Sequence, residues 1–110
     1  MTAFHPPRAT PDEFLQALGT LDAAIDHVRR DAGNGASPEH QYVLLALMRR
    51  LRALVGNDAM ALAGDVRDAA LRALDASNPA AALVMLELAY GSLRGLLNRL
   101  AGFGGMSRAA

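Results

Sequence analysis

Three prolines each follow a helix-capping residue, and these pairs divide the chain into helices. They are Thr10-Pro11, Ser37-Pro38 and Asn78-Pro79. A side-chain oxygen at the N-cap accepts a hydrogen bond from an unpaired backbone N–H, and proline at the next position gives up an N–H that had no partner. Each pair therefore predicts the start of a helix. Glu13 follows Thr10 by three positions and completes a capping-box pattern.

The predicted helices span residues 11–32, 38–55, 58–76 and 79–101. Glycines mark three of the expected ends, at Gly33, Gly56 and Gly102. Short connections between long helices favour antiparallel neighbours, so the expected fold is an all-α, up-down-up-down four-helix bundle. We expect one domain over residues 10–102, with a disordered head at 1–9 and a flexible tail at 103–110.

Apolar residues recur at helical spacing in all four segments, with different strength. The first and last helices each have one clear stripe, formed by Phe14, Leu18, Leu21, Ile25 and Val28 and by Leu83, Leu86, Tyr90, Leu93, Leu97 and Leu100. Residues 38–55 are apolar over the widest arc, which predicts that this helix is the most buried. Residues 58–76 are predicted to form the weakest helix, because alanine makes up half of the apolar face and Gly64 interrupts it.

Composition excludes several classes of protein. The 110 residues contain no cysteine, so disulfides, thiolate nucleophiles and cysteine-based metal sites are absent. Eleven basic residues balance eleven acidic ones, and all the basic residues are arginine. This balance gives no general attraction to nucleic acid. Frequent alanine and the absence of lysine suggest a bacterial source rich in G and C. The first residues lack a secretory signal, so we expect a cytoplasmic protein, with leaderless export left open.

The histidines are weak candidates for chemistry. His27 is predicted to lie on the polar side of its helix, and an exposed histidine on a four-helix bundle invites comparison with histidine phosphotransfer domains. In those domains a lysine follows three positions later and a glycine four positions later, whereas this chain has Arg30 and Asp31. We therefore expect a surface histidine paired with Asp31. His40 is expected at one end of the core.

Metal, acid-base and nucleic-acid sites find little support. No glutamate is followed three positions later by histidine, as dinuclear metal sites in bundles require. Asp22 and Asp26 share one face, where ion pairs with arginine are the expected role. The candidate anion patch consists of Arg49, Arg50 and Arg52, but helical geometry spreads these side chains over about 160°. We expect no cofactor and no nucleic-acid partner.

The most suggestive feature is a second strip on the last helix, formed by Val84, Leu88, Gly91 and Gly95. It lies opposite the core-facing stripe, so the helix is either sandwiched in its own bundle or meets another molecule. Gly91 and Gly95 have the spacing that lets a partner helix approach closely. The apolar run from residue 80 to residue 93 contains Glu87 and is predicted to be too short to span a membrane.

By elimination, the sequence favours a non-enzymatic helical protein that acts by protein association. Homo-oligomer, adaptor, immunity-type protein and secretion accessory all remain open. The alternative is a phosphotransfer-like module centred on His27. That alternative needs His27 to be exposed and surrounded by cations.

Overall fold

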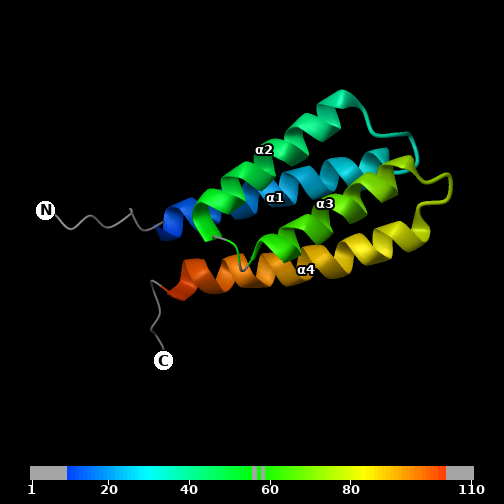
Figure 1. The fold of residues 1–110 in the computed structure, drawn as a ribbon. Helices are drawn as coiled ribbons and strands as arrows, with labels where there is room; N and C mark the ends of the chain where they lie inside the picture. Colours follow the sequence, from blue (N-terminus) through cyan, green and yellow to red (C-terminus); the bar gives the residue numbers. More distant parts are fainter. Residues whose placement is uncertain (1–9, 56, 58, 104–110) are drawn as a thin grey trace, which may run out of the picture.

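The computed structural model describes residues 10–55, 57 and 59–103. These residues form four helices: α1 (Pro11–Asp31), α2 (Pro38–Val55), α3 (Met60–Asp75) and α4 (Ala80–Phe103). The predicted all-α fold with four helices is confirmed. Successive helices run in opposite directions along the molecule (Figure 1). The predictions for residues 1–9, 104–110 and Gly56 lie outside the described residues.

The predicted caps of α1 and α2 are present. The Thr10 hydroxyl accepts from the backbone N–H of Glu13 at 3.2 Å, and the Glu13 carboxylate accepts from the N–H of Thr10 at 2.8 Å. Ser37 forms the same reciprocal pair with His40: its hydroxyl accepts from the His40 N–H at 3.1 Å, and the imidazole Nδ1 accepts from the Ser37 N–H at 3.2 Å. Both loop-to-helix junctions are therefore fixed by local hydrogen bonds.

The boundaries of α3 and α4 differ from the prediction. Helix α3 begins at Met60, after Ala59, which has no side-chain oxygen to act as a cap. Asn78 caps α4 loosely, because its side-chain oxygen lies 3.5 Å from the Ala80 nitrogen. Helix α4 continues through Gly102 to Phe103, so glycine at position 102 does not stop it.

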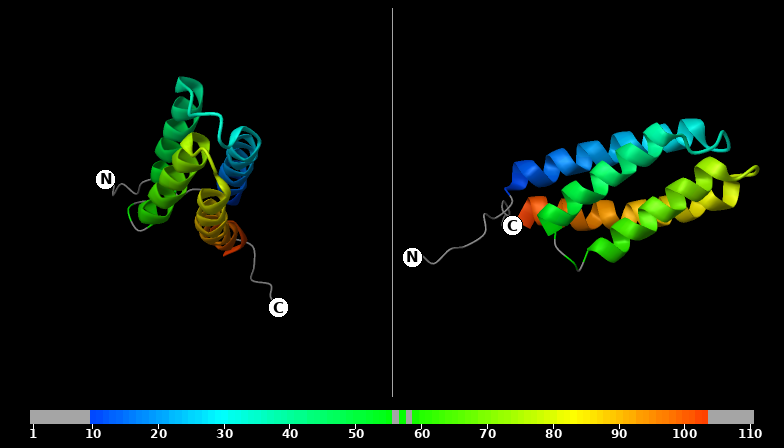
Figure 2. Two further views of the ribbon diagram at one scale, coloured as in Figure 1. Left: turned by 90° about the vertical axis from the view of Figure 1, so that its right-hand side faces the viewer. Right: turned by 45° about the horizontal axis from the view of Figure 1, so that its top comes forward.

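Helix α4 packs against both α1 and α3. Helix α2 also packs on α1 and α3, and within the described residues its backbone does not come close to that of α4. The end-on view in Figure 2 shows α2 on the far side of the molecule from α4. The shared core is aliphatic, with Leu21, Ile25, Leu51, Leu74, Leu86, Leu93 and Leu97 among its fully buried side chains.

The prediction that α2 is the most buried helix is wrong. Only Leu44, Leu47 and Leu51 of α2 are buried, whereas α1 buries seven residues. Tyr42 and Leu45 of α2 face solvent, and the Tyr42 side chain is 70% exposed. A wide apolar arc needs neighbours on several sides, and α2 has neighbours on only one.

The loop between α1 and α2 is bound to the end of α3. The N–H groups of Gly33 and Gly35 donate to the carbonyls of Ala73 and Leu74 at 2.9 and 2.7 Å. These are carbonyls of the last turn of α3, which have no partner within the helix. Gly33 adopts a φ of +86°, which favours glycine. The glycine-rich loop therefore ends one helix and caps another.

Candidate functional site

The two faces of α4 differ sharply in burial. Leu86, Leu93 and Leu97 face inward and are completely buried. Val84 and Leu88 face outward, and their side chains are 60% and 64% exposed. The predicted second strip is therefore exposed and does not serve internal packing. Met85 is also 60% exposed and belongs to the same surface, which the sequence pattern did not indicate.

The two glycines of the strip leave open notches on the outer side of α4. A Cβ atom added to Gly91 would meet nothing within 4 Å. One added to Gly95 would meet only an Arg99 guanidinium nitrogen, at 3.6 Å. Crowding inside the fold therefore does not explain either glycine. The strip has two large apolar side chains at one end and two notches at the other.

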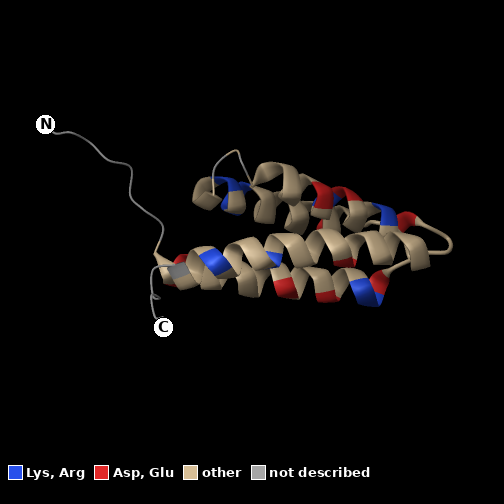
Figure 3. Cartoon of the chain, turned by 90° about the horizontal axis from the view of Figure 1, so that it is seen from below, with Lys and Arg blue, Asp and Glu red and all other residues tan. Residues whose placement is uncertain are grey.

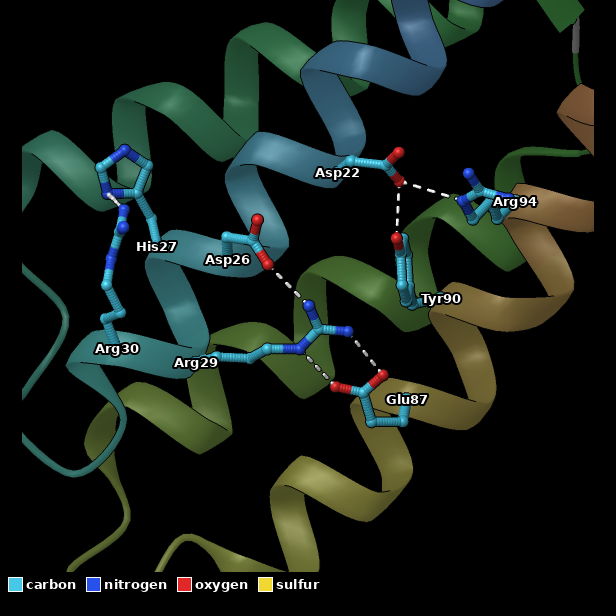
Figure 4. Close-up of polar contacts among 8 residues, drawn as sticks. All are labelled: Asp22, Asp26, His27, Arg29, Arg30, Glu87, Tyr90 and Arg94. Carbon is cyan, nitrogen blue, oxygen red and sulfur yellow. Dashed lines mark hydrogen bonds and ion pairs between the residues drawn. The ribbon is translucent and has the colours of Figure 1, made fainter.

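The nearest charges of α4 point sideways towards α1. Glu87 accepts two hydrogen bonds from the Arg29 guanidinium, at 2.7 and 2.8 Å, and Asp26 binds the same group at 2.6 Å (Figure 4). Further along, Asp22 accepts from the Tyr90 hydroxyl at 2.6 Å and from Arg94 at 3.2 Å. These contacts fix α4 against α1. Val84, Met85, Leu88 and Gly91 form an uncharged part of the outer face, whereas the Arg99 guanidinium lies beside Gly95.

The ion pairs shift several pKa values in the expected directions. The hydrogen bonds from Arg29 lower the pKa of the Glu87 carboxyl, and Glu87 in turn raises the pKa of Arg29. Burial, followed by the bond to Asp22, raises the pKa of the Tyr90 hydroxyl. All these groups therefore keep their ordinary charge states at neutral pH, which is typical of structural ion pairs rather than of acid-base catalysts.

An open groove of about 650 Å³ separates α3 from α4 and runs beside the outer strip. Met85, Leu88 and Ala89 line its α4 side, and Asp65 and Asp68 stand on its α3 side. Figure 3 shows the molecule from below, with a few charged positions separated by uncharged stretches on α4 and with both acidic and basic residues on α3. The apolar surface thus has a groove on one side and the α1 ion pairs on the other.

Helix α4 is longer than the apolar run, residues 80–93, on which the prediction against a membrane span was based. The segment Ala80–Gly102 is long and apolar enough to cross a membrane by length and composition, and 17% of its most apolar window is buried in the fold. In this fold, however, Glu87, Tyr90 and Arg94 of the same segment are bonded to α1. A spanning arrangement would have to break these contacts.

His27 lies on an exposed part of α1 between two hollows. Its Nδ1 is 3.2 Å from an Arg30 guanidinium nitrogen, and His27 lines a cavity of about 260 Å³ between α1 and α2. The expected pairing with Asp31 is wrong, because the Asp31 carboxylate binds His40 Nε2 at 2.8 Å. Asp31 and Glu39 also line the cavity, so its charge is mixed.

Three polar side chains at the start of α2, those of Ser37, His40 and Asp31, are hydrogen-bonded in a row, which was not predicted from the sequence. Ser37 Oγ lies 2.8 Å from His40 Nδ1, and His40 Nε2 lies 2.8 Å from Asp31. Nδ1 and Oγ already serve the helix cap, and Nε2 links the cap to the end of α1. These contacts fix the α1–α2 loop. The spacing of serine and histidine, with histidine in the place of the capping-box glutamate, was the available signal.

The candidate anion patch is divided in the structure. Arg50 turns towards α1, where its guanidinium donates to the Gln16 side chain at 2.9 Å. Arg49 and Arg52 are exposed on the outer side of α2. Within residues 10–55, 57 and 59–103, no three acidic or histidine side chains lie close enough together to hold a metal ion.

Comparisons with known proteins give no further direction. No family model, curated protein or solved structure matches this chain. The site therefore has to be interpreted from its own geometry.

Proposed function

We propose that this chain is a non-enzymatic helical protein that acts by protein association through the outer face of α4. This outer surface consists of Val84, Met85, Leu88, Gly91 and Gly95. The observation that carries the proposal is the exposure of three large apolar residues, Val84, Met85 and Leu88, on one face of the helix. Large apolar side chains that gather on one face of a folded protein usually mark an interaction site. Homo-oligomer, adaptor, immunity-type protein and secretion accessory are all compatible roles.

The packing of α4 supports a pre-formed surface. Three leucines anchor its inner face, and the contacts of Arg29 and Asp22 fix its rotation about the helix axis. A partner would therefore meet a rigid helix, and binding would cost little conformational entropy. A surface held in this way is suited to recognition of another helix, because the glycine notches permit close approach.

Leu88→Glu tests the proposal, because it puts a charge in the middle of the outer surface without touching the core. We expect the variant to keep wild-type helicity and melting temperature while complex formation is lost. Partners would be sought in extract of the organism that encodes the protein, and amide hydrogen exchange would map the bound surface. Protection that appears on α2 and leaves α4 unchanged would contradict the proposal.

Leu45→Glu is a matched control. Leu45 is an exposed leucine on α2, whose backbone does not come close to that of α4 within the described residues. The same chemical change there should leave binding intact. Loss of binding in both variants would indicate a general effect of added charge rather than a located surface.

A second candidate function, phosphoryl transfer at His27, is favoured by one observation. His27 is exposed and has Arg30 beside it, where a cation could stabilise a phosphoryl group. The carboxylates of Asp31 and Glu39 around the same cavity oppose it. We expect no labelling of His27 by a small phosphodonor such as acetyl phosphate. Stoichiometric, acid-labile labelling that is lost in His27→Ala would establish this second function instead.

A further inference from the structure

We infer that the outer surface of α4 binds a second copy of this chain, with the two α4 helices antiparallel in a defined register. The inference rests on the proposed function and names its partner. It draws on the order of residues along the strip, the shape of the notches and the charges beside them.

The strip is self-complementary when it is reversed. Val84 and Leu88 are four residues apart, and so are Gly91 and Gly95. An antiparallel copy that places Leu88 opposite Gly91 therefore also places Val84 opposite Gly95. A two-fold axis repeats both contacts, so each copy inserts two side chains at two glycines. The Gly91 notch is open, whereas the flexible Arg99 side chain beside Gly95 has to move aside to admit Val84. A parallel arrangement would place Leu88 against Leu88 and leave the glycines facing each other.

The charges beside the strip fit the same register. A two-fold axis between antiparallel helices keeps the α1 sides of the two copies on the same side of the interface. Glu87 then lies within about 3 Å along the helix axis of Arg94 from the second copy. Both side chains are close to half exposed although they have partners on α1, so each can accept a second contact. Such pairs contribute more to register than to affinity.

Carboxylates of α3, on the other side of the strip, are expected to weaken the dimer. Asp65 and Asp68 line the groove beside Leu88 and Ser92, where they would face their own equivalents across the axis. Like charges weaken the association, so Asp65→Asn should tighten the dimer.

Sedimentation equilibrium over a range of concentrations tests whether a second copy of the chain binds the outer surface of α4. The wild-type protein is expected to show a monomer–dimer equilibrium, Leu88→Glu to be monomeric, and Leu45→Glu to dimerise as the wild type does. A wild-type protein that stays monomeric at the highest soluble concentration would overturn the inference. So would recruitment of the monomer to phosphatidylglycerol vesicles that depends on Leu88.

Cysteine cross-linking tests the register, since the natural chain has no cysteine. Leu88→Cys and Gly91→Cys proteins are mixed and oxidised, and each is also oxidised alone. The antiparallel register predicts disulfides between the two different variants and few within either one. Efficient Leu88→Cys homodimers would overturn the register, because they would place Leu88 opposite Leu88, as in a parallel pair or in an antiparallel pair with a shifted register.

The outcomes separate this inference from the proposed function. If the protein is monomeric and a different protein protects α4 from amide exchange, the second copy is the wrong occupant but the surface stands. If neither the second copy nor another protein covers α4, both fail.

Discussion

Helices α2 and α4 both expose large apolar side chains, yet they hold very different places in the fold. Helix α4 packs extensively against α1 and α3, completely buries three leucines, and exposes Val84, Met85 and Leu88. Helix α2 packs less extensively against the same two helices, buries three residues, and exposes Tyr42, Val43 and Leu45 near its start. The apolar content of a helix therefore says little about its burial. How extensively the neighbouring helices pack on it decides which apolar side chains reach the core.

The largest expected loss of stability comes from a substitution on the buried side of α2. Leu51 is completely buried, so Leu51→Ala should cost about 2 to 5 kcal/mol through lost packing and a residual cavity. Leu45→Ala on the exposed side should change the free energy of unfolding by less than about 0.5 kcal/mol. Urea denaturation of both variants measures the contrast. Similar losses would mean that α2 is buried on both sides, as its sequence suggested.

The cap of α2 is expected to matter more than the cap of α1. Loss of a capping hydroxyl typically costs about 0.5 to 2 kcal/mol. Ser37→Ala also removes a contact to His40, which links α2 to Asp31 of α1, whereas Thr10→Ala breaks only a local cap. We therefore expect Ser37→Ala at the upper end of this range and Thr10→Ala at the lower end. Equal losses in thermal unfolding would show that the link to α1 contributes nothing.

The ion pair that fixes α4 should give a small, pH-dependent contribution. Folding lowers the pKa of Glu87, so its contribution is complete above the unfolded-state pKa of about 4.3 and is lost as pH falls from there through the lower pKa of the folded state. Because both side chains are well exposed, we expect Glu87→Gln to cost at most about 1 kcal/mol at pH 7. Stability curves of wild type and variant should converge at acidic pH, below the folded-state pKa of Glu87. A constant difference over this range would assign the effect to packing.

The starts of α1 and α2 and the existence of a second apolar strip on α4 could be predicted because they depend on local sequence, whereas the exposure of the strip could not. A cap needs residues three positions apart, and a second apolar strip is visible from helical spacing alone. The burial of α2 could not be predicted, since periodicity shows which side is apolar but not which neighbours are present. The contact of Arg29 with Glu87 joins residues 58 positions apart, and it depends on the pairing and rotation of two helices.

A substitution at Gly91 should change the stability of the monomer and the strength of the dimer in opposite directions. Gly91→Ala should stabilise the monomer by up to about 1 kcal/mol, because alanine favours the helix and the added Cβ meets nothing. The same methyl group fills the notch opposite Leu88 and should weaken the dimer. Gly64→Ala in α3 is a matched control, since its Cβ also meets nothing, and it should stabilise the monomer without changing association. Melting temperatures at low protein concentration, where little dimer contributes, and sedimentation equilibrium give the two quantities separately. If Gly91→Ala dimerises as strongly as Gly64→Ala, the glycine notch has no part in binding, and the contact on α4 must lie on Val84, Met85 and Leu88 alone.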